Sequence, residues 1–154
     1  GAFVRVAQMA GALDSALALS IHYANERQQF GKPIGKFQAV QQALAMLAEE
    51  AAAVNCAGQA AARALDSGDA LFEIAAAKVR AGIAADFGVT ISHQVHGAIG
   101  FTQEHPLHRL TRRLMSWRSE FGGERLWGEH LGKQVCARGA DAFWSGLTAR
   151  GDVG

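Results

Sequence analysis

Apolar residues recur every three or four positions over residues 3–26 of the chain. This spacing places them on one face of a helix, as in a helix with one buried side. The positions are Val6, Met9, Ala10, Leu13, Leu17, Ile21 and Ala24. The pattern stops at residues 27–35, where Gly31, Pro33 and Gly35 favour turns and end helices. The sequence therefore predicts a long helix followed by a compact, non-helical connection.

The same spacing returns over residues 36–65 and again over residues 71–96. It predicts two further long helices. The turn between them falls at residues 66–69, and we expect the carboxylate of Asp69 to cap the third helix. Residues 97–105 interrupt the pattern once more, and they form the next predicted connection.

Two more helices are predicted toward the end of the chain. Pro106 suits the first turn of a short helix that ends near Ser119, because a helix needs no N–H there. Gly122 and Gly123 break the chain, and a last helix is expected over residues 124–147. Long helices joined by tight turns predict an all-α fold, namely an antiparallel (up-and-down) four-helix bundle with one additional short helix. No strand is expected.

The composition agrees with closely packed helices in one domain over residues 1–154. Hydrophobic residues make up 49% and charged residues 19% of the chain. The formal net charge is only +1 and the basic residues are scattered, so no nucleic-acid partner is expected. The two cysteines lack C-x-x-C spacing, which argues against a disulfide or a zinc site and favours a cytoplasmic localisation. No uninterrupted apolar stretch approaches the roughly 20 residues of a membrane span, so none is expected.

Two breaks between helices carry residues that suit ligand binding. Arg27 follows the first helix beside two amides and an aromatic ring. Its guanidinium could hold a phosphate through two hydrogen bonds, or it could form a capping or interhelical ion pair. Gly97 and Gly100 follow the third helix, where glycine allows the backbone to approach a ligand or simply to turn. The residues alone leave these alternatives open.

Two histidine pairs have a spacing that can place both imidazoles on one helix face. They are His93 with His96 and His105 with His108. Neither pair lies in an H-E-x-x-H context or has a carboxylate in matching register, so no metal site is predicted.

Two stretches combine glycine, aromatic and amide residues at characteristic positions. Residues 23–38 read YANERQQFGKPIGKFQ and residues 94–106 read QVHGAIGFTQEHP. They resemble the signatures of the acyl-CoA dehydrogenase C-terminal domain, approximately Y-x-x-x-R-x-x-F-G-x-x-[IL]-x-x-x-Q and Q-x-x-G-G-x-G-[FY]-x-x-E-x-P. Both occur in order, separated by the expected pair of long helices, and the resemblance covers almost the whole chain.

The resemblance implies a flavoprotein that binds FAD. Members of that family carry an N-terminal helical domain, a middle β-domain and this bundle, with FAD held between domains and across a subunit interface. Only the bundle is expected in this chain. By the resemblance, Arg27 would meet the FAD diphosphate, while Gln29 and Phe30 would lie against the cofactor.

The second signature supplies the remaining cofactor residues that the resemblance implies. Gln94, together with Gln38 at the end of the first signature, would hydrogen-bond the adenosine side of FAD. Gly97 and Ala98 would let the chain pass close to the cofactor. Ala98 departs from the family, which usually has a second glycine there, and adds one methyl group.

The resemblance leaves the catalytic base open. Many family members present a glutamate in a Y-E-G-T-like stretch after the second signature, and ungapped counting puts Phe121 in that slot. Glu120, one residue away, is the catalytic candidate, although one residue turns a helical side chain by about 100°. Some relatives carry the glutamate on the first helix instead, at a slot that falls at Gly1 or just before it.

These features predict that the complete protein is an FAD-dependent acyl-CoA dehydrogenase of fatty-acid or related acyl catabolism. Its acyl-CoA substrate would lose an α-proton to a carboxylate and a hydride to the flavin, which an electron-transfer acceptor reoxidises. We expect a homo- or hetero-oligomer of dehydrogenase subunits, and an inactive isolated domain. The alternative, favoured by Phe121, is a catalytically silent FAD-binding or structural subunit that pairs with a paralogous dehydrogenase.

Overall fold

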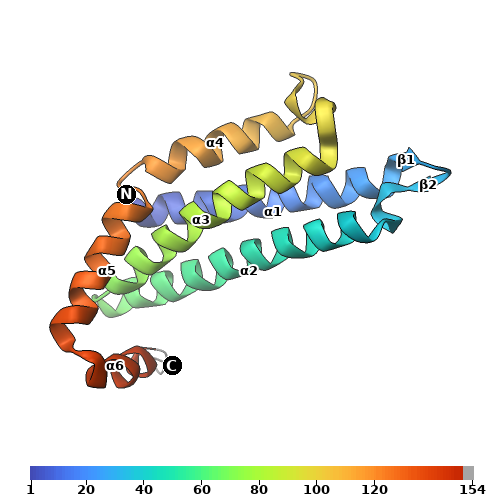
Figure 1. Ribbon diagram of the computed structural model, residues 1–154. Helices are drawn as coiled ribbons and strands as arrows, with labels where there is room; N and C mark the ends of the chain where they lie inside the picture. The colour runs from blue at the N-terminus through green and yellow to red at the C-terminus, as the bar shows by residue number, and fades with distance from the viewer. Residues whose placement is uncertain (151–154) are drawn as a thin grey trace.

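The computed structural model describes residues 1–150, which form six α-helices joined by short connections (Figure 1). The predicted all-α fold is confirmed. The helices are α1 (Ala2–Glu26), α2 (Gln38–Ser67), α3 (Leu71–His96), α4 (Leu107–Ser119), α5 (Glu124–Arg138) and α6 (Phe143–Ala149). Single 3-10 turns span Ile34–Lys36, Gly97–Phe101 and Ala140–Ala142.

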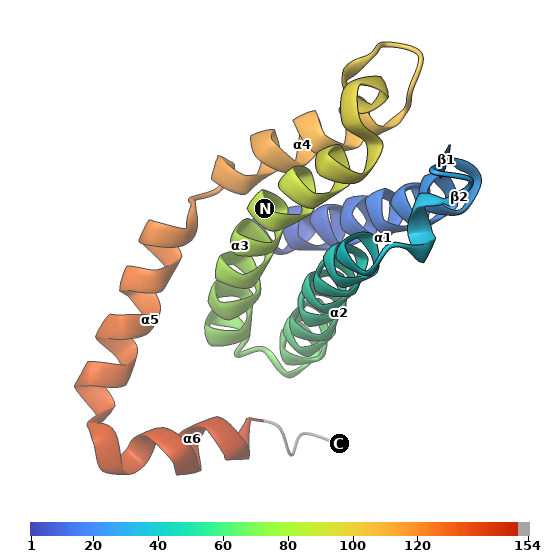
Figure 2. The same cartoon turned by 45° about the vertical axis from the view of Figure 1, so that its right-hand side comes forward.

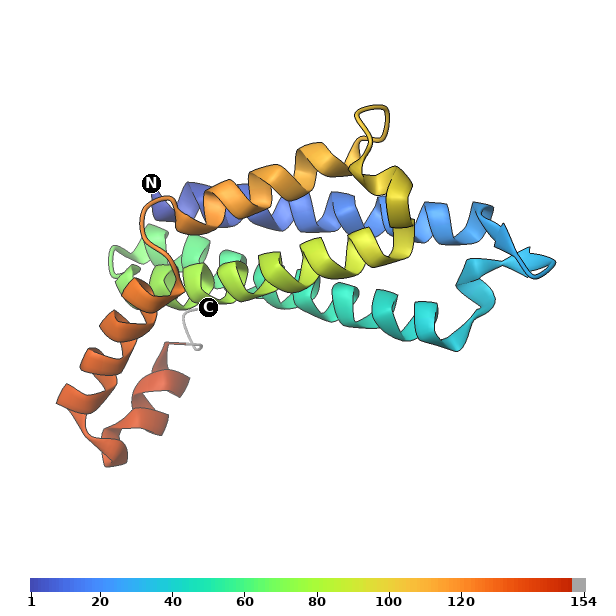
Figure 3. The same cartoon turned by 45° about the horizontal axis from the view of Figure 1, so that its top comes forward.

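Helices α1 to α4 form the bundle. The long helices α1, α2 and α3 pack against one another in an antiparallel arrangement, and α4 lies along α1 and α3 (Figures 1 and 3). Helix α5 begins near the N-terminal end of α1, packs on α3 and then leads away from the bundle, and α6 turns back from its end (Figure 2). The short predicted helix is thus the fourth member of the bundle.

The last predicted helix is interrupted. It was expected over residues 124–147, but α5 ends at Arg138 and α6 begins at Phe143. Gly139 separates them with φ 80° and ψ 161°, a conformation that a helix cannot contain. The prediction of one continuous helix was therefore wrong.

The connection after α1 contains a small hairpin, which contradicts the expectation of no strand. Strand β1 (Gln28–Gln29) pairs antiparallel with β2 (Lys32–Pro33). Between them, Phe30 has φ 51° and Gly31 has φ 76°. Positive φ at both central residues defines a type I′ turn, whose twist matches that of antiparallel strands. Two-residue strands are too short to show an alternating pattern in the sequence.

The predicted cap of α3 is also wrong. The residue before the helix is Ala70, and no side chain caps α3. The Asp69 carboxylate instead accepts a hydrogen bond from Arg150 Nη2 at 2.9 Å. The guanidinium of Arg150 also donates to both carboxylate oxygens of Glu73, so the chain after α6 is tied to the start of α3.

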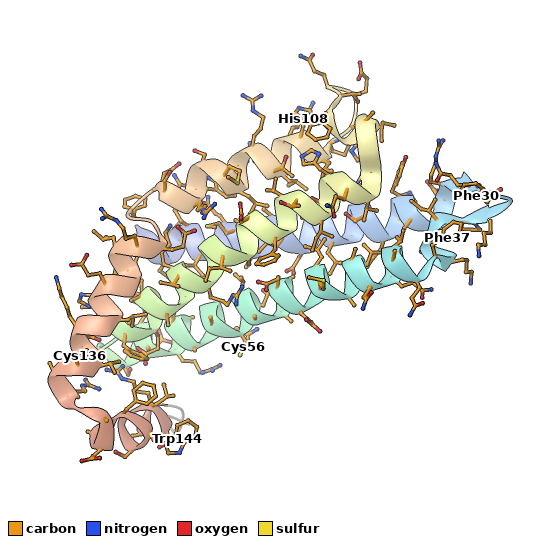
Figure 4. The ribbon with its side chains drawn as sticks, in the orientation of Figure 1. Phe30, Phe37, Cys56, His108, Cys136 and Trp144 are labelled. Atoms are coloured by element: carbon orange, nitrogen blue, oxygen red, sulfur yellow. The ribbon has the colours of Figure 1, made fainter. Side chains whose placement is uncertain are left out.

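The core consists of apolar side chains on the inner faces of the bundle helices. Alanine contributes heavily, and its small side chain lets the helix axes approach closely. Fully buried members include Val6, Met9 and Leu13 of α1, Leu47 and Val54 of α2, Ala77, Ala81, Ala84 and Ala85 of α3, and Leu114 of α4. Cys56 on α2 and Cys136 on α5 are exposed and carry free thiols (Figure 4).

Helix α1 is long and apolar enough to cross a membrane by length and composition, with a mean hydropathy of 1.3 over 18 residues. The sequence was expected to contain no membrane span, whereas α1 passes this test of length and composition. However, Val6, Met9 and Leu13 are fully buried against the other helices. A core helix of a helical bundle passes the same test, and that is how α1 packs here.

Gly88 lies where the Leu13 side chain of α1 packs on α3. A Cβ atom at this position would lie 2.4 Å from Leu13 Cδ2 and 3.5 Å from Leu47 Cδ1. Both leucines are fully buried, so neither has space to move away. The packing of the three long helices therefore requires the absence of a side chain at residue 88.

We expect Gly88→Ala to lower the free energy of unfolding by about 1–3 kcal/mol through overpacking, although Ala favours helices by ~1 kcal/mol. Gly11→Ala on α1 is the matched control, because its Cβ would meet nothing within 4 Å. The control should stabilise the protein slightly. Chemical denaturation followed by circular dichroism measures both, and equal stabilisation by the two variants would contradict the packing argument.

Candidate functional site

A groove of about 750 Å³ lies at the end of the bundle where α1 meets the hairpin and α3 ends. It brings together six of the seven cofactor-binding residues predicted from the sequence: Arg27, Gln29, Phe30, Gln94, Gly97 and Ala98. Gln38, the first residue of α2, is exposed and does not line the groove. Residues that are about 65 positions apart in the sequence thus form one surface.

Arg27 joins α1 to the hairpin. Its backbone N–H donates to the Tyr23 carbonyl at 2.9 Å, and its own carbonyl accepts from the Ile34 N–H at 2.8 Å. Its side chain is exposed and forms no ion pair with residues 1–150. Of the two alternatives for this guanidinium, the geometry favours the one in which it meets an external anion.

Phe30 stands at the tip of the hairpin, with 92% of its surface exposed (Figure 4). Its left-handed backbone conformation costs a residue other than glycine roughly 1–2 kcal/mol. The ring touches only the edge of Phe37 among the aromatic side chains, with ring centroids 6.1 Å apart. Strained, exposed residues concentrate where a protein contacts a ligand or partner, so this tip suits contact with a group outside the chain.

Gly97 ends α3 with φ 63° and ψ −144°, a conformation that is open essentially only to glycine. A Cβ atom there would meet nothing within 4 Å, so the requirement comes from the backbone and not from packing. Ala98 beside it is exposed. Its extra methyl group therefore lies on the open surface of the groove.

Beneath the groove lies a cluster of aromatic rings that the sequence did not predict as part of the site. Tyr23 of α1 stacks on His96 of α3, with ring centroids 4.7 Å apart and planes at 26°. His105, from the loop before α4, meets both rings edge-on. The cluster ties the two signature stretches together. In the sequence, the one sign of this cluster is that Tyr23, His96 and His105 all lie within the two signature stretches.

His96 is buried. Its Nδ1–H donates to the Ser92 carbonyl at 2.8 Å, and its Nε2 has no hydrogen-bond partner within residues 1–150. Burial lowers the pKa of His96 most, the adjacent His105 and His93 lower it further, and nearby carbonyls oppose this. Burial also lowers the pKa of His93, whose Nε2 lies 3.0 Å from Thr111 Oγ1.

We expect the protein to lose stability as the pH falls below about 6.5, the ordinary histidine pKa. Because His93 and His96 have lowered pKa values when folded, the unfolded chain binds more protons in that range. The stabilisation is complete above pH 6.5 and declines toward the folded-state pKa. Denaturation from pH 5 to 8 measures it, and His96→Phe should flatten the profile. An identical profile for this variant would contradict the assignment.

The catalytic candidate Glu120 lies at the other end of the bundle, directly after α4. Its Oε2 accepts a hydrogen bond from Arg5 Nε at 2.7 Å and forms an ion pair with Arg5 Nη2 at 2.5 Å. Its Oε1 accepts from Ser116 Oγ at 3.1 Å. Both carboxylate oxygens of Glu120 are therefore engaged by side chains of the bundle itself. The geometry thus favours a structural role for Glu120 over the catalytic one.

Phe121 occupies the slot that the resemblance assigns to the base. It has φ 57°, its carbonyl accepts a hydrogen bond from Trp127 Nε1 at 3.0 Å, and 58% of its surface is exposed. A Cβ atom on Gly1 would lie 2.5 Å from Phe121 Cδ1. The two alternative slots for the base, one on each segment, therefore meet in space. Neither Phe121 nor Gly1 carries a carboxylate.

The two candidate regions are far apart. Arg5, beside Glu120, and Arg27, in the groove, are 22 residues apart along α1, or roughly 33 Å at 1.5 Å per residue. The two ends of α1 lie at opposite ends of the bundle (Figure 1). The groove and the Glu120 segment of one chain therefore form two separate regions.

Comparison with known proteins identifies the family. A family model described as acyl-CoA dehydrogenase, C-terminal domain, matches residues 1–134. The chain therefore belongs to the acyl-CoA dehydrogenase family and corresponds to its C-terminal domain. The acryloyl-CoA reductase (NADH) of Anaerotignum propionicum is 36% identical over 107 residues, which cover 69% of this chain and 27% of the reductase. An acyl-CoA dehydrogenase of Mycobacterium tuberculosis is 38% identical over 134 residues, 82% of this chain and 18% of that protein.

Solved structures share the fold. The ChsE4–ChsE5 complex of Mycobacterium tuberculosis superposes with a TM-score of 0.87 and 28% identity, over 90% of this chain and 38% of the matched one. Butyryl-CoA dehydrogenase of Megasphaera elsdenii gives 0.83 and 28%, over 87% and 35%. The FAD complex of PigA gives 0.79 and 27%, over 85% and 34%. The chain thus spans between 18% and 38% of the length of these proteins and of the relatives above.

Proposed function

We propose that this chain is the C-terminal domain of an FAD-dependent acyl-CoA dehydrogenase and that its groove binds the diphosphate and adenosine part of FAD. The observation that carries the proposal is the convergence of Arg27, Gln94 and Gly97 on one groove. The relatives support a CoA thioester as substrate, because those named above include an acyl-CoA dehydrogenase and an acryloyl-CoA reductase.

The residues of the groove fit such a cofactor. The guanidinium of Arg27, which forms no ion pair within residues 1–150, suits a diphosphate, which it can bind through two hydrogen bonds. The side-chain amides of Gln29 and Gln94 can donate and accept hydrogen bonds at polar edges. Apolar side chains, including Ile34, complete the lining. Gly97 allows backbone to approach closely. FAD, when bound, supplies the hydride acceptor of the reaction.

The groove predicts a loss of FAD in Arg27→Ala. Removing a charge-assisted contact to a diphosphate costs about 1.5–3 kcal/mol, so the affinity for FAD should fall roughly tenfold to a hundredfold in the complete protein. The matched control is Arg125→Ala, an exposed arginine on α5. Titration of the apoprotein with FAD measures both variants. Equal affinities for Arg27→Ala and the control would remove Arg27 from the cofactor site.

The proton acceptor of the proposed reaction is a separate question. Glu120 is held by Arg5 and Ser116, and Phe121 cannot accept a proton. We therefore propose that the base lies N-terminal to Gly1 in the complete protein. Near Gly1 it would face the Phe121 segment, which is where the two slots meet.

Glu120→Gln tests this assignment in the complete protein. We expect flavin reduction by an acyl-CoA, followed by anaerobic stopped-flow absorbance, to remain within about twofold of the wild-type rate, whereas loss of a general base costs 10² to 10⁴. Glu129→Gln is the control, because Glu129 is exposed and its one ion pair within residues 1–150 is with Lys133. A hundredfold slower reduction confined to Glu120→Gln would make Glu120 the base.

The second candidate function is a catalytically silent subunit whose groove completes the active site of a paralogous dehydrogenase. Phe121 in the base slot favours it, and so does the likeness to a chain of the two-component ChsE4–ChsE5 complex. Flavin reduction by the complete protein alone supports the first function. Reduction only after a paralogous subunit is added supports the second.

For either function we also propose an oligomeric assembly and an electron-transfer partner. A homo- or hetero-oligomer would place the groove of one subunit beside the substrate region of another. An electron-transfer acceptor would reoxidise the flavin, and the fold is also shared with a structure described as an electron transferring flavoprotein of Acidaminococcus fermentans. We propose a cytoplasmic localisation for the complete protein.

A further inference from the structure

Lys78 is a buried charged residue that the proposed FAD groove does not use. It lies on α3 at the end of the bundle opposite the groove, and only 1% of its surface is exposed. Its Nζ donates to the carbonyls of Trp117 at 3.1 Å and Arg118 at 2.7 Å. Both carbonyls belong to the last turn of α4. A single side chain of the central helix thus holds the end of a neighbouring helix.

These contacts suit an ammonium group. The last four carbonyls of a helix lack donors within the helix, and a cation near them interacts favourably with the helix dipole. The carboxylates of Glu124 and Glu120 also lie close enough to affect the pKa of Lys78. Burial lowers the pKa of Lys78, whereas Glu124 and Glu120 raise it. The carbonyls and carboxylates together compensate for removing the charge from water.

The segment that follows α4 is held from several sides. Glu120 is paired with Arg5 of α1. The Gly122 N–H donates to the Ser119 carbonyl at 3.2 Å, and Trp127 Nε1 donates to the Phe121 carbonyl. Phe121 keeps its left-handed conformation inside this frame. The segment leaves α4 directly after the two carbonyls that Lys78 contacts.

We propose that Lys78 is a positioning residue for residues 120–123. By fixing the end of α4 it places Phe121 against Gly1, the residue before α1, and so shapes the wall of the bundle that faces the acyl-CoA. The second part rests on the proposed function, which puts the substrate beside this segment. The first part rests on the contacts of Lys78 alone.

The effect of Lys78 does not depend on which side chains occupy positions 117 and 118, because both of its acceptors are backbone carbonyls. Replacement of Lys78 by methionine keeps a long, unbranched side chain but removes the donor. Lys133→Met is the matched control. Lys133 is exposed on α5 and pairs only with Glu129.

Hydrogen exchange of the complete protein, followed by mass spectrometry, tests the positioning role. In Lys78→Met we expect the backbone amides of residues 120–127 to exchange at least tenfold faster than in the wild type. The hairpin amides of residues 28–34, at the opposite end, should exchange at the wild-type rate, and Lys133→Met should change neither segment. Unchanged exchange at residues 120–127, or an equal rise in both segments, would overturn the proposal.

A binding measurement tests the link to substrate. We expect the affinity of Lys78→Met for an acyl-CoA to fall at least fivefold, while its FAD content stays equal to that of the wild type. Wild-type affinity together with faster exchange would confine Lys78 to holding the loop and overturn its role at the substrate. If the wild type binds no acyl-CoA, the proposed function fails, and the exchange comparison still decides whether Lys78 positions the segment.

A second variant covers the case in which Lys78→Met does not fold. Lys78→Gln retains one donor group of shorter reach, so it should show the same local rise in exchange at residues 120–127 with smaller amplitude. Exchange in Lys78→Gln that equals the wild type in both segments would count against the proposal.

Discussion

The close approach of α1 to α3 is the constraint on which the rest of the structure depends. Gly88 offers no side chain where Leu13 inserts, and the neighbouring alanines of α3 keep the helix narrow along its buried face. Because of this, α3 contacts α1, α2, α4 and α5. Residues toward the two ends of α3 therefore belong to different regions of the bundle. Gln94 lines the groove, and Lys78 contacts the end of α4.

The two ends of the bundle share one structural device. At each end, a phenylalanine followed by a glycine takes positive φ: Phe30 with Gly31 in the hairpin, and Phe121 with Gly122 after α4. Left-handed conformations at phenylalanine persist only where surrounding contacts hold them. At one end these contacts are the paired strands, and at the other they are the Trp127 hydrogen bond and the Lys78 anchor. Both rings are exposed.

The separation of the two ends bears on how a complete protein of this family would work. The groove and the Phe121 segment, roughly 33 Å apart along α1, cannot surround the same reacting atoms. One chain would then contribute to two sites, each completed by other domains or by another subunit. Such an arrangement suits a two-component assembly, because one subunit can keep its groove while its own base slot holds phenylalanine.

Much of the fold could be read from the sequence, because helices with one buried face must repeat apolar residues with the period of the helix. That period predicted the bounds of α1, α2 and α3 to within a few residues, and the glycines and prolines indicated the breaks between these helices. Six of the seven cofactor-binding residues that were predicted from the two signature stretches line the groove, because residues within one motif keep the same local geometry. Gln38 belonged to the motif and yet lies outside the lining.

The tertiary structure alone decided the rest. The hairpin, the break at Gly139 and the true contacts of Asp69 depend on single backbone angles and on residues distant in sequence, so no periodicity reveals them. The same holds for the Arg5–Glu120 pair and for the burial of Lys78 against two backbone carbonyls. A sequence by itself determines which faces of its helices are apolar, because that follows from local order. Which side chains meet across the bundle is decided only when the helices pack.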